Sequence, residues 1–199
     1  MPSPPPSDRA TVRRDGRGHY ERAVIDAILD EAIVCHLGVV QEDGTPLVLP
    51  TLFVRDGDHV YVHGSPASRM LRAGKKQAID VCLTVMLLDG LVMAKSAFHH
   101  SINYRSVVVF GTAAELTERA EKLRALTALV EHVHPGRSTA SRPPNDIELR
   151  TTLVLRLSLD EASAKVRTGP PVDDEEDMAL PYWAGVIPVA TVRGEPIDA

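Results

Sequence analysis

The chain of 199 residues has few aromatic side chains, only two cysteines and no long apolar run. Cys35 and Cys82 are isolated, without a CxxC pattern or a disulfide framework, which favours a reducing compartment. Apolar runs such as residues 81–88 are much shorter than the roughly 20 residues of a membrane-spanning helix. The N-terminus also has no apolar stretch of the kind found in secretory signals. We therefore expect a cytoplasmic protein without a membrane segment.

The chain also has little net charge. The formal charge is −5, and residues 170–199 alone hold seven acidic residues and one arginine, so the rest is about neutral. Nucleic-acid-binding domains carry clustered basic residues, and no nucleic-acid partner is expected here. A hydrophobic content of 44% with 25% charged residues is ordinary for a folded protein and excludes a wholly disordered chain.

Composition divides the chain into three regions. Residues 1–18 hold four of the 15 prolines and scattered arginines, which predicts a flexible N-terminal arm. Residues 19–167 alternate short apolar runs with turn signals, as compact domains do. Residues 168–199 form an acidic C-terminal tail that contains Trp183, the only tryptophan. We expect this tail to pack on the central domain or on a partner subunit.

The central region predicts strands joined mostly by tight turns. A strong hairpin signal, Asp89-Gly90, lies between two of them. The predicted strands cover residues 33–40, 47–55, 59–64, 78–88, 91–98, 104–116 and 151–159.

Helical periodicity is limited to a few segments. Residues 21–32 would present Ala23, Val24, Ala27, Ile28 and Ala32 on one face, and residues 117–133 would present a leucine-rich face. A short helix is also expected to end near Gly74. Tight turns imply antiparallel pairing, and antiparallel strands with few helices favour a small barrel or sandwich. The pattern predicts a mainly β, antiparallel barrel.

Residues 63–69 (HGSPASR) are the most informative segment for chemistry. Ser65 is a good helix N-cap and Pro66 suits the first helical turn. The free backbone N–H groups of such a helix start, with the Ser65 and Ser68 hydroxyls and the Arg69 guanidinium, would bind a phosphate. A capped surface helix with a solvated arginine explains the same residues, and the preceding His63-Gly64 does not decide between the two.

Residues 98–106 (FHHSINYRS) are polar and aromatic but lead directly into an apolar strand. Polar groups at the start of a buried strand need partners, so this segment is either the wall of a ligand site or an interface. Equally, Arg105 could pair with an acidic neighbour. Taken alone, Pro50 indicates an edge or bulge in a strand, and Trp183 indicates an anchor for the tail.

Other motifs argue against several classes of site. The two histidine pairs, His99-His100 and His132-x-His134, diverge, and no HExxH or Cys/His pattern is present, so no metal site is expected. The sequence has no G-x-S-x-G, no GxGxxG after a strand and no Walker loop. His63 could relay a proton, although packing in the core or against a cofactor explains it better. No catalytic residue is predicted.

Several segments in this order resemble the pyridoxamine 5'-phosphate oxidase-related split barrels, closest to the branch of the nitroimidazole-resistance proteins. They are Pro50-Thr51 within a strand, then YVHGSPASRML, VCLTV and NYRSVVVFGTAAEL, and finally Trp183-x-Gly185. The resemblance covers roughly residues 20–190. It implies an antiparallel six-stranded split barrel that forms a homodimer and holds FMN in a cleft at the dimer interface.

The same resemblance assigns roles along the two strands before residue 65. Pro50, Thr51 and Leu52 correspond to the strand whose backbone runs along the isoalloxazine edge. His63 and Gly64 correspond to the strand end beside the cofactor.

It assigns further flavin contacts later in the chain. The phosphate-binding turn corresponds to Ser65, Ser68 and Arg69, the same anion site that capping predicts. A tryptophan that covers the cofactor, from either subunit, corresponds to Trp183. The strand start that reaches the flavin corresponds to Tyr104, Arg105 and Ser106.

The resemblance implies an FMN-binding protein, expected to be a flavin-dependent oxidoreductase acting on a small molecule. FAD, a deazaflavin or haem are less favoured cofactors. After Trp183 the sequence lacks the Arg-x-His with which pyridoxamine phosphate oxidases bind their substrate, which argues against the vitamin reaction. The alternative hypotheses are a non-enzymatic flavin or haem binder, for storage or sensing, and a structural dimer with an empty cleft.

Overall fold

A computed structural model describes residues 3–14, 16–65 and 78–198 of the chain. They form two compact units, which are described separately: unit 1 comprises Met1–Met86 and Ser106–Lys165, and unit 2 comprises Leu87–Arg105 and Val166–Ala199. The predicted helix ending near Gly74 lies outside the described residues. No helix of the described ranges is long and apolar enough to cross a membrane.

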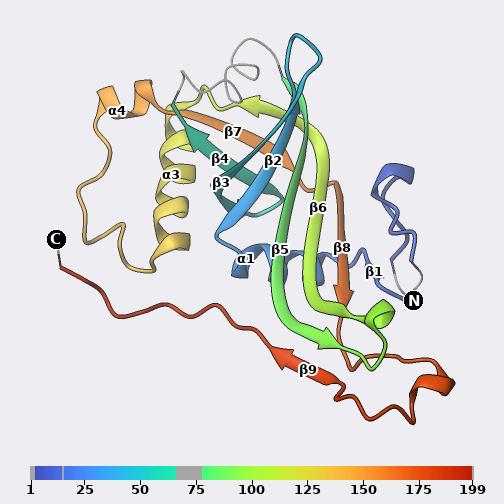
Figure 1. Ribbon diagram of the computed structural model, residues 1–199. Helices are drawn as coiled ribbons and strands as arrows, with labels where there is room; N and C mark the ends of the chain where they lie inside the picture. The colour runs from blue at the N-terminus through green and yellow to red at the C-terminus, as the bar shows by residue number, and fades with distance from the viewer. Residues whose placement is uncertain (1–2, 15, 66–77, 199) are drawn as a thin grey trace. The chain divides into compact units, whose positions relative to one another are not determined.

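Six strands form a closed antiparallel ring, in the order β6-β7-β4-β3-β2-β5 with β5 pairing back to β6 (Figure 1). This ring confirms the predicted six-stranded barrel. The strands are β2 (Val34–Val40), β3 (Pro46–Asp56), β4 (His59–Gly64), β5 (Ile79–Met93), β6 (Ser101–Glu115) and β7 (Leu153–Ser158). Two further strands, β1 (Gly18–His19) and β8 (Glu161–Arg167), extend the sheet beside β6.

Alternation along the strands separates the barrel interior from its outer face. In β2, Cys35, Leu37 and Val39 are buried, whereas Val34 and Val40 are exposed. In β4, by contrast, three successive residues, Val60 to Val62, are all buried. Both faces of β4 are therefore covered here.

The helix α3 (Arg119–Val133) covers the outer face of β3 and β4. Its residues Ala125 and Leu129 pack with Val54 and Tyr61 in one buried cluster, which also includes Leu116 and Val154. The predicted helix at residues 117–133 is confirmed, with its start two residues later. A second helix, α4 (Asp146–Thr151), precedes β7.

Helix α1 (Arg22–Glu31) buries Ile28 and Ala32 as predicted, but the rest of its buried face is rotated from the predicted one. Its buried residues are Ile25, Ile28 and Leu29, followed by Ala32, whereas Ala23 and Ala27 are exposed. This face has the same helical spacing but carries the larger side chains, and so it removes more apolar area from water.

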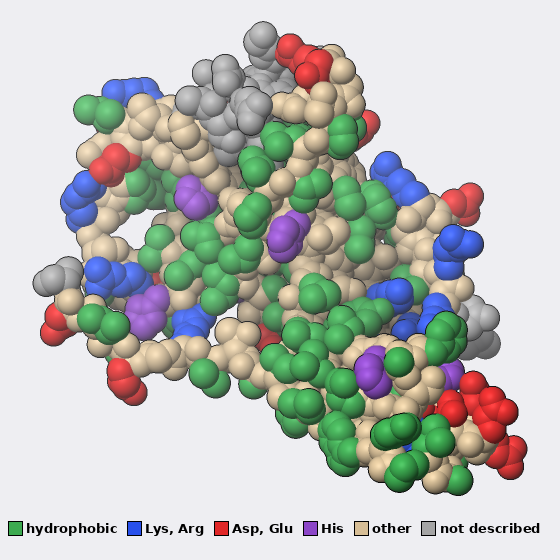
Figure 2. All heavy atoms as spheres, in the orientation of Figure 1, with side chains coloured by type: hydrophobic (Ala, Val, Ile, Leu, Met, Phe, Trp, Pro, Cys, Tyr) green, Lys and Arg blue, Asp and Glu red, His purple; other side chains and the backbone are tan. Residues whose placement is uncertain are grey.

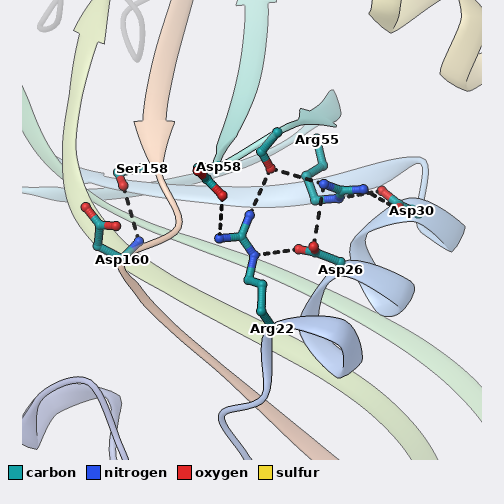
Figure 3. Close-up of polar contacts among 8 residues, drawn as sticks. Arg22, Asp26, Asp30, Arg55, Asp58, Ser158 and Asp160 are labelled. Atoms are coloured by element: carbon teal, nitrogen blue, oxygen red, sulfur yellow. Dashed lines mark hydrogen bonds and ion pairs between the residues drawn. The ribbon is translucent and has the colours of Figure 1, made fainter.

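An ion-pair network ties α1 to the β3–β4 turn (Figure 3). The Arg55 guanidinium donates two hydrogen bonds of 2.7 Å to the Asp30 carboxylate, and Arg22 donates one of 2.7 Å to Asp26. Arg22 and Arg55 also both donate to the Gly57 carbonyl, at 2.8 and 3.1 Å. The Asp30 carboxylate accepts two hydrogen bonds from one guanidinium, and the Gly57 carbonyl accepts from both arginines. The network therefore holds the β3–β4 turn against α1.

The predicted hairpin at Asp89-Gly90 is wrong. Both residues lie inside the continuous strand β5, where Gly90 is in register with Pro188 of β9 (Gly185–Pro188). A Cβ on Gly90 would lie 2.9 Å from Val186 Cγ1, so the glycine serves the close approach of β9 and not a turn. The chain reverses further on, through the short helix η2 (Ala97–His99).

The remaining described segments are short. Near the N-terminus, in η1 (Asp8–Ala10), Ala10 is buried, and Arg9 pairs with Glu161 and lies 5.3 Å from the ring centroid of Phe110. In unit 2, η3 (Glu175–Asp177) follows Asp173, whose carboxylate accepts the backbone N–H groups of Lys95 and Ser96. The predicted boundaries after residues 18 and 167 stay predictions.

Candidate functional site

Unit 1 contains a cavity of about 710 Å³, here called the α3 cavity, between helix α3 and the ends of β3 and β4. Leu52 and His63 line it from the strands, and the second half of α3 lines it from the other side. The third wall is the connection from α3 to α4, residues 134–144. The volume falls within the roughly 300–1,000 Å³ typical of small-molecule and cofactor sites.

His63 is the most unusual residue of this cavity. Its Nδ1 atom is buried and has no hydrogen-bond partner in the described part of the protein. Burial lowers the pKa of the imidazole, which therefore stays neutral near pH 7. A buried polar atom without a partner is rare in folded proteins, and a neutral imidazole can accept a hydrogen bond or coordinate a metal.

The connection wall is held in place by carboxylates. Glu131 accepts hydrogen bonds from the backbone N–H groups of Gly136, at 2.6 Å, and Ser138, at 2.8 Å. The Ser138 hydroxyl, and after it these two N–H groups, lower the pKa of Glu131. Glu148 accepts from the Arg142 guanidinium at 2.6 and 2.9 Å, which lowers its pKa to about 2. These bonds hold the connection wall in one conformation.

The same wall carries the cation Arg137. Arg137 lines the cavity, and its guanidinium makes no ion pair or hydrogen bond to any residue that the structure describes. Arg142, by contrast, is committed to Glu148. Within the described ranges, the cavity therefore has apolar walls and an Arg137 guanidinium without an ion pair, whereas the His63 Nδ1 is shielded inside the protein.

Of the predicted flavin contacts on β3, Pro50 and Leu52 lie on the outer face of the barrel, and Thr51 between them points to the opposite face. Pro50 is exposed, opposite His36 of β2, in the part of β3 that pairs with β2 alone among the described residues. The absence of a described second neighbour along this part of β3 agrees with the edge interpretation of Pro50. Thr51 is half-buried, and Leu52 turns toward the α3 cavity.

The phosphate-binding turn is only partly described. Gly64 ends β4 and Ser65 is exposed directly after it, whereas Ser68 and Arg69 lie outside the described residues. The anion site that capping predicts stays a prediction.

The later candidates divide between the two units. In unit 2, Arg105 forms a two-pronged ion pair with Asp89, with distances of 2.8 and 3.0 Å, which is the acidic neighbour that the alternative interpretation required. Tyr104 is half-buried, and Trp183 is 63% exposed with its ring over Gly185, where a Cβ would lie 2.8 Å from it. In unit 1, the Ser106 hydroxyl donates to the Lys165 carbonyl at 3.2 Å.

The structure thus brings Leu52 and His63 together in one cavity and distributes the other candidates over two units. The sequence did not single out Arg137, and of the four histidines weighed as metal ligands only His134 lines this cavity. His132 instead bonds the Ala32 carbonyl at 2.7 Å. Within the described ranges, no group of three or more ligating side chains could hold a metal ion.

The sequence profile of the family described as "Pyridoxamine 5'-phosphate oxidase" matches residues 21–166. A comparison with curated proteins found no match.

Solved structures are similar over nearly the whole chain. The flavocytochrome Anf3 from Azotobacter vinelandii is 45% identical, with a TM-score of 0.91, over 98% of this chain and 90% of that one. The FAD and heme binding protein from Mycobacterium smegmatis is 36% identical, with a TM-score of 0.87, over 92% and 89%.

A protein from Bacteroides thetaiotaomicron, named for 5-nitroimidazole antibiotic resistance, is 23% identical with a TM-score of 0.61, over 75% of this chain and 86% of that one. At this identity the likeness shows a shared fold. With the profile match over residues 21–166 and two relatives above 30% identity, the chain belongs to the pyridoxamine 5'-phosphate oxidase-related family of split barrels.

Proposed function

We propose that this protein binds a flavin and haem, and that it is an oxidoreductase of the flavocytochrome type acting on a small molecule. The observation that carries the proposal is the 45% identity to a flavocytochrome over 98% of the chain. The Mycobacterium smegmatis protein, 36% identical, is named for the same two cofactors. A bound flavin supplies one- and two-electron chemistry, and a bound haem supplies one-electron or O₂ chemistry.

For the flavin, we expect FAD ahead of the FMN that the family resemblance implies, because FAD is in the name of the Mycobacterium smegmatis relative. The exposed residues Pro50 and Leu52 and the strand end at Gly64 and Ser65 would contact it. Ser68 and Arg69 would add the phosphate contacts. This chain's own residues would bind and orient the flavin, and none of the described ones is placed as its acid or base.

We also propose a homodimer with the flavin at its interface. The support is an apolar strip on the outer face of β2, β3 and β5, consisting of Val34, Val40, Val48, Pro50 and Met86. Val40 is 68% and Val48 61% exposed, and hydrophobic side chains gather over these strands in Figure 2. Contiguous apolar patches on strands usually mark protein interfaces.

The dimer is tested by light scattering on the full chain. Val48→Asp should shift the protein to monomer, because it places a charge at the centre of the strip. Ile147→Asp is the matched control, since Ile147 is 63% exposed on α4 and away from the strip. A dimer that survives Val48→Asp would rule out this strip as the interface.

The function is tested on the purified full chain by its visible spectrum, followed by chromatography of the released flavin and a haemochrome assay. We expect a flavin spectrum together with a Soret band, and FAD as the released nucleotide. Reduction of the bound cofactors by an electron donor with multiple turnovers supports the oxidoreductase. Stable cofactors without turnover would favour a storage or sensing protein, and a colourless protein that takes up neither cofactor would overturn the proposal.

A further inference from the structure

Several polar side chains of the α3 cavity are committed to bonds within unit 1. The Ser141 hydroxyl donates to the Arg137 carbonyl at 2.9 Å, and the Thr152 hydroxyl donates to the Glu148 carbonyl at 2.8 Å. The protons of these two hydroxyl groups are therefore already used. The polar selectivity of the cavity depends on its charged side chains.

The Glu148 carboxylate is not available to a cationic ligand. Its two oxygens accept hydrogen bonds from the Arg142 guanidinium at 2.6 and 2.9 Å, and one of them also accepts the Asn145 N–H at 2.9 Å. Among the described residues that line the cavity, Glu148 is the only acidic one. Its pairing leaves the described lining without a negative charge to bind a cation.

Arg137 is the opposite case. Its guanidinium makes no hydrogen bond or ion pair with the described residues, and its side chain is exposed, so it lies at the solvent-accessible edge of the cavity. A guanidinium has five N–H donors and no acceptor, and it therefore selects a ligand group that only accepts. A carboxylate presents two such oxygens to one planar guanidinium.

The remaining walls of the cavity are largely apolar. Leu126, Leu129, Val130 and Val133 line it from α3, and Leu52 lines it from β3. Val130 is 38% and Leu52 36% exposed, so a ligand that covers them removes apolar area from water. A volume of about 710 Å³ suits a small molecule. The lining therefore fits a ligand with an apolar body and one acceptor-only group.

The cavity also borders residues for which we propose flavin contacts. Leu52 belongs to both sets, and His63, which lines the cavity, directly precedes Gly64 at the end of β4. A flavin enzyme must hold its substrate beside the flavin. A ligand of the α3 cavity would lie beside these parts of β3 and β4.

We propose that the α3 cavity binds the substrate of this protein, and that the substrate is a small organic carboxylate with an apolar body, recognised by Arg137. The inference rests on the proposed oxidoreductase function and adds the place and the chemical class of the substrate. Binding itself is measured without turnover, so the two can fail separately.

The test is isothermal titration calorimetry of the purified full-length protein with three probes that share one alkyl chain: decanoate, 1-decanol and decylamine. Decanoate should bind about 5–10-fold more tightly than 1-decanol, because an ionic contact at an exposed edge is weaker than a buried one. Decylamine should bind more weakly than both. Added salt should reduce the preference for decanoate, since it screens exposed charges.

Arg137→Gln tests the recognition of the carboxylate. It should remove the preference for decanoate and leave the affinity for 1-decanol unchanged, a pattern that general loss of structure would not produce. Arg150→Gln is the matched control, because Arg150 is exposed on α4 and does not line the cavity. It makes the same change in net charge and should keep the preference.

Val130→Trp tests the cavity itself. Val130 is partly exposed, so the larger side chain should be accepted by the fold and should occlude the space. Both decanoate and 1-decanol should lose at least about tenfold in affinity. Ile147→Trp is the matched control, since Ile147 is 63% exposed on α4 outside the cavity, and it should bind both probes like the wild type.

The outcomes separate the site from the function. Equal affinity for decanoate and 1-decanol, or a preference that survives Arg137→Gln, overturns the recognition by Arg137. Release of a flavin or haem by decanoate would also overturn the proposal, because a cofactor would then fill the cavity. Saturating decanoate should shift the visible absorption of the bound flavin, and an unchanged spectrum would refute the substrate role. A protein that binds decanoate as expected but takes up no flavin refutes the proposed function, and the substrate role with it, while the carboxylate site stands.

Discussion

Tyr61 and His63 lie two residues apart on the same face of β4, under the same helix, and have opposite surroundings. Tyr61 is 1% exposed, packed in the cluster of Val54 and Leu129, and its hydroxyl accepts a hydrogen bond of 3.4 Å from Arg124. His63 is half-buried, faces the α3 cavity, and has a buried nitrogen without a partner among the described residues. One part of the space between α3 and the strands is packed core around Tyr61, here called the packed half. The other part is the α3 cavity beside His63, here called the hollow half.

The space for a ligand lies where the chain leaves helix α3. Helix α3 ends at Val133, and the chain turns away at Gly136, with φ of +84°, and returns only at α4. Residues 134–144 then wall the space without filling it. An open space of about 710 Å³ with an internally bonded wall is typical of a small-molecule site.

The largest effect is expected from truncating the packed half. Tyr61→Ala removes a buried ring and should lower the free energy of unfolding by about 3–5 kcal/mol, because it opens a new cavity. His63→Ala should cost less than about 1 kcal/mol in the cofactor-free protein, because its side chain already borders a void. Urea unfolding of both variants measures the contrast. Equal losses would show that the two halves are packed alike.

Leu129 belongs to both halves, since it is buried in the cluster and lines the cavity. Leu129→Ala should therefore cost about 2–3 kcal/mol, at the lower end of the range for buried leucines, because some of its contacts are already missing. Val130→Ala, on the exposed cavity side, is the control and should cost under about 1 kcal/mol. A loss near 5 kcal/mol for Leu129→Ala would mean that the cavity is filled in solution.

The barrel itself was predictable, because its signals are local. Strict alternation at Cys35, Leu37 and Val39 and turns such as Asp43-Gly44 define each strand within a few residues. The error at Asp89-Gly90 has a non-local cause: Gly90 is small because β9, about a hundred residues later, packs against it. A dipeptide cannot reveal whether its glycine serves a turn or a neighbour.

The candidate site was predictable only where a motif carried it. The family resemblance singled out Leu52 and His63, and both line the α3 cavity. Arg137 carried no signal, because an arginine in a polar loop is ordinary until the fold places it against an apolar wall. Arg105 was correctly given two interpretations, and its pairing with Asp89 depends on a contact across two strands that spacing does not encode.

The connection wall of the α3 cavity can be destabilised without changing the packed half around Tyr61. Asn145 accepts hydrogen bonds from the Ile147 and Glu148 backbone N–H groups, both at 2.9 Å, and forms a capping box with Glu148. Asn145→Ala should cost about 1 kcal/mol. Hydrogen exchange should increase at residues 134–151 and stay unchanged in β4 around Tyr61. Faster exchange in both places would show that wall and core unfold as one.

The smallest effect on stability is expected at Arg142, whose side chain is exposed. Its two hydrogen bonds hold the pKa of Glu148 at about 2, below the ordinary 4.5. Because the folded-state pKa is the lower one, the stabilisation is fully present above pH 4.5 and is lost as the pH falls through about 2. Arg142→Ala should raise this pKa toward 4.5, which NMR titration of the Glu148 carboxyl measures, with Arg119→Ala as a control on another exposed pair. If the Glu148 pKa stays near 2 in Arg142→Ala, the Asn145 N–H alone lowers it. The connection wall would then be held by the capping box and not by the Arg142–Glu148 ion pair.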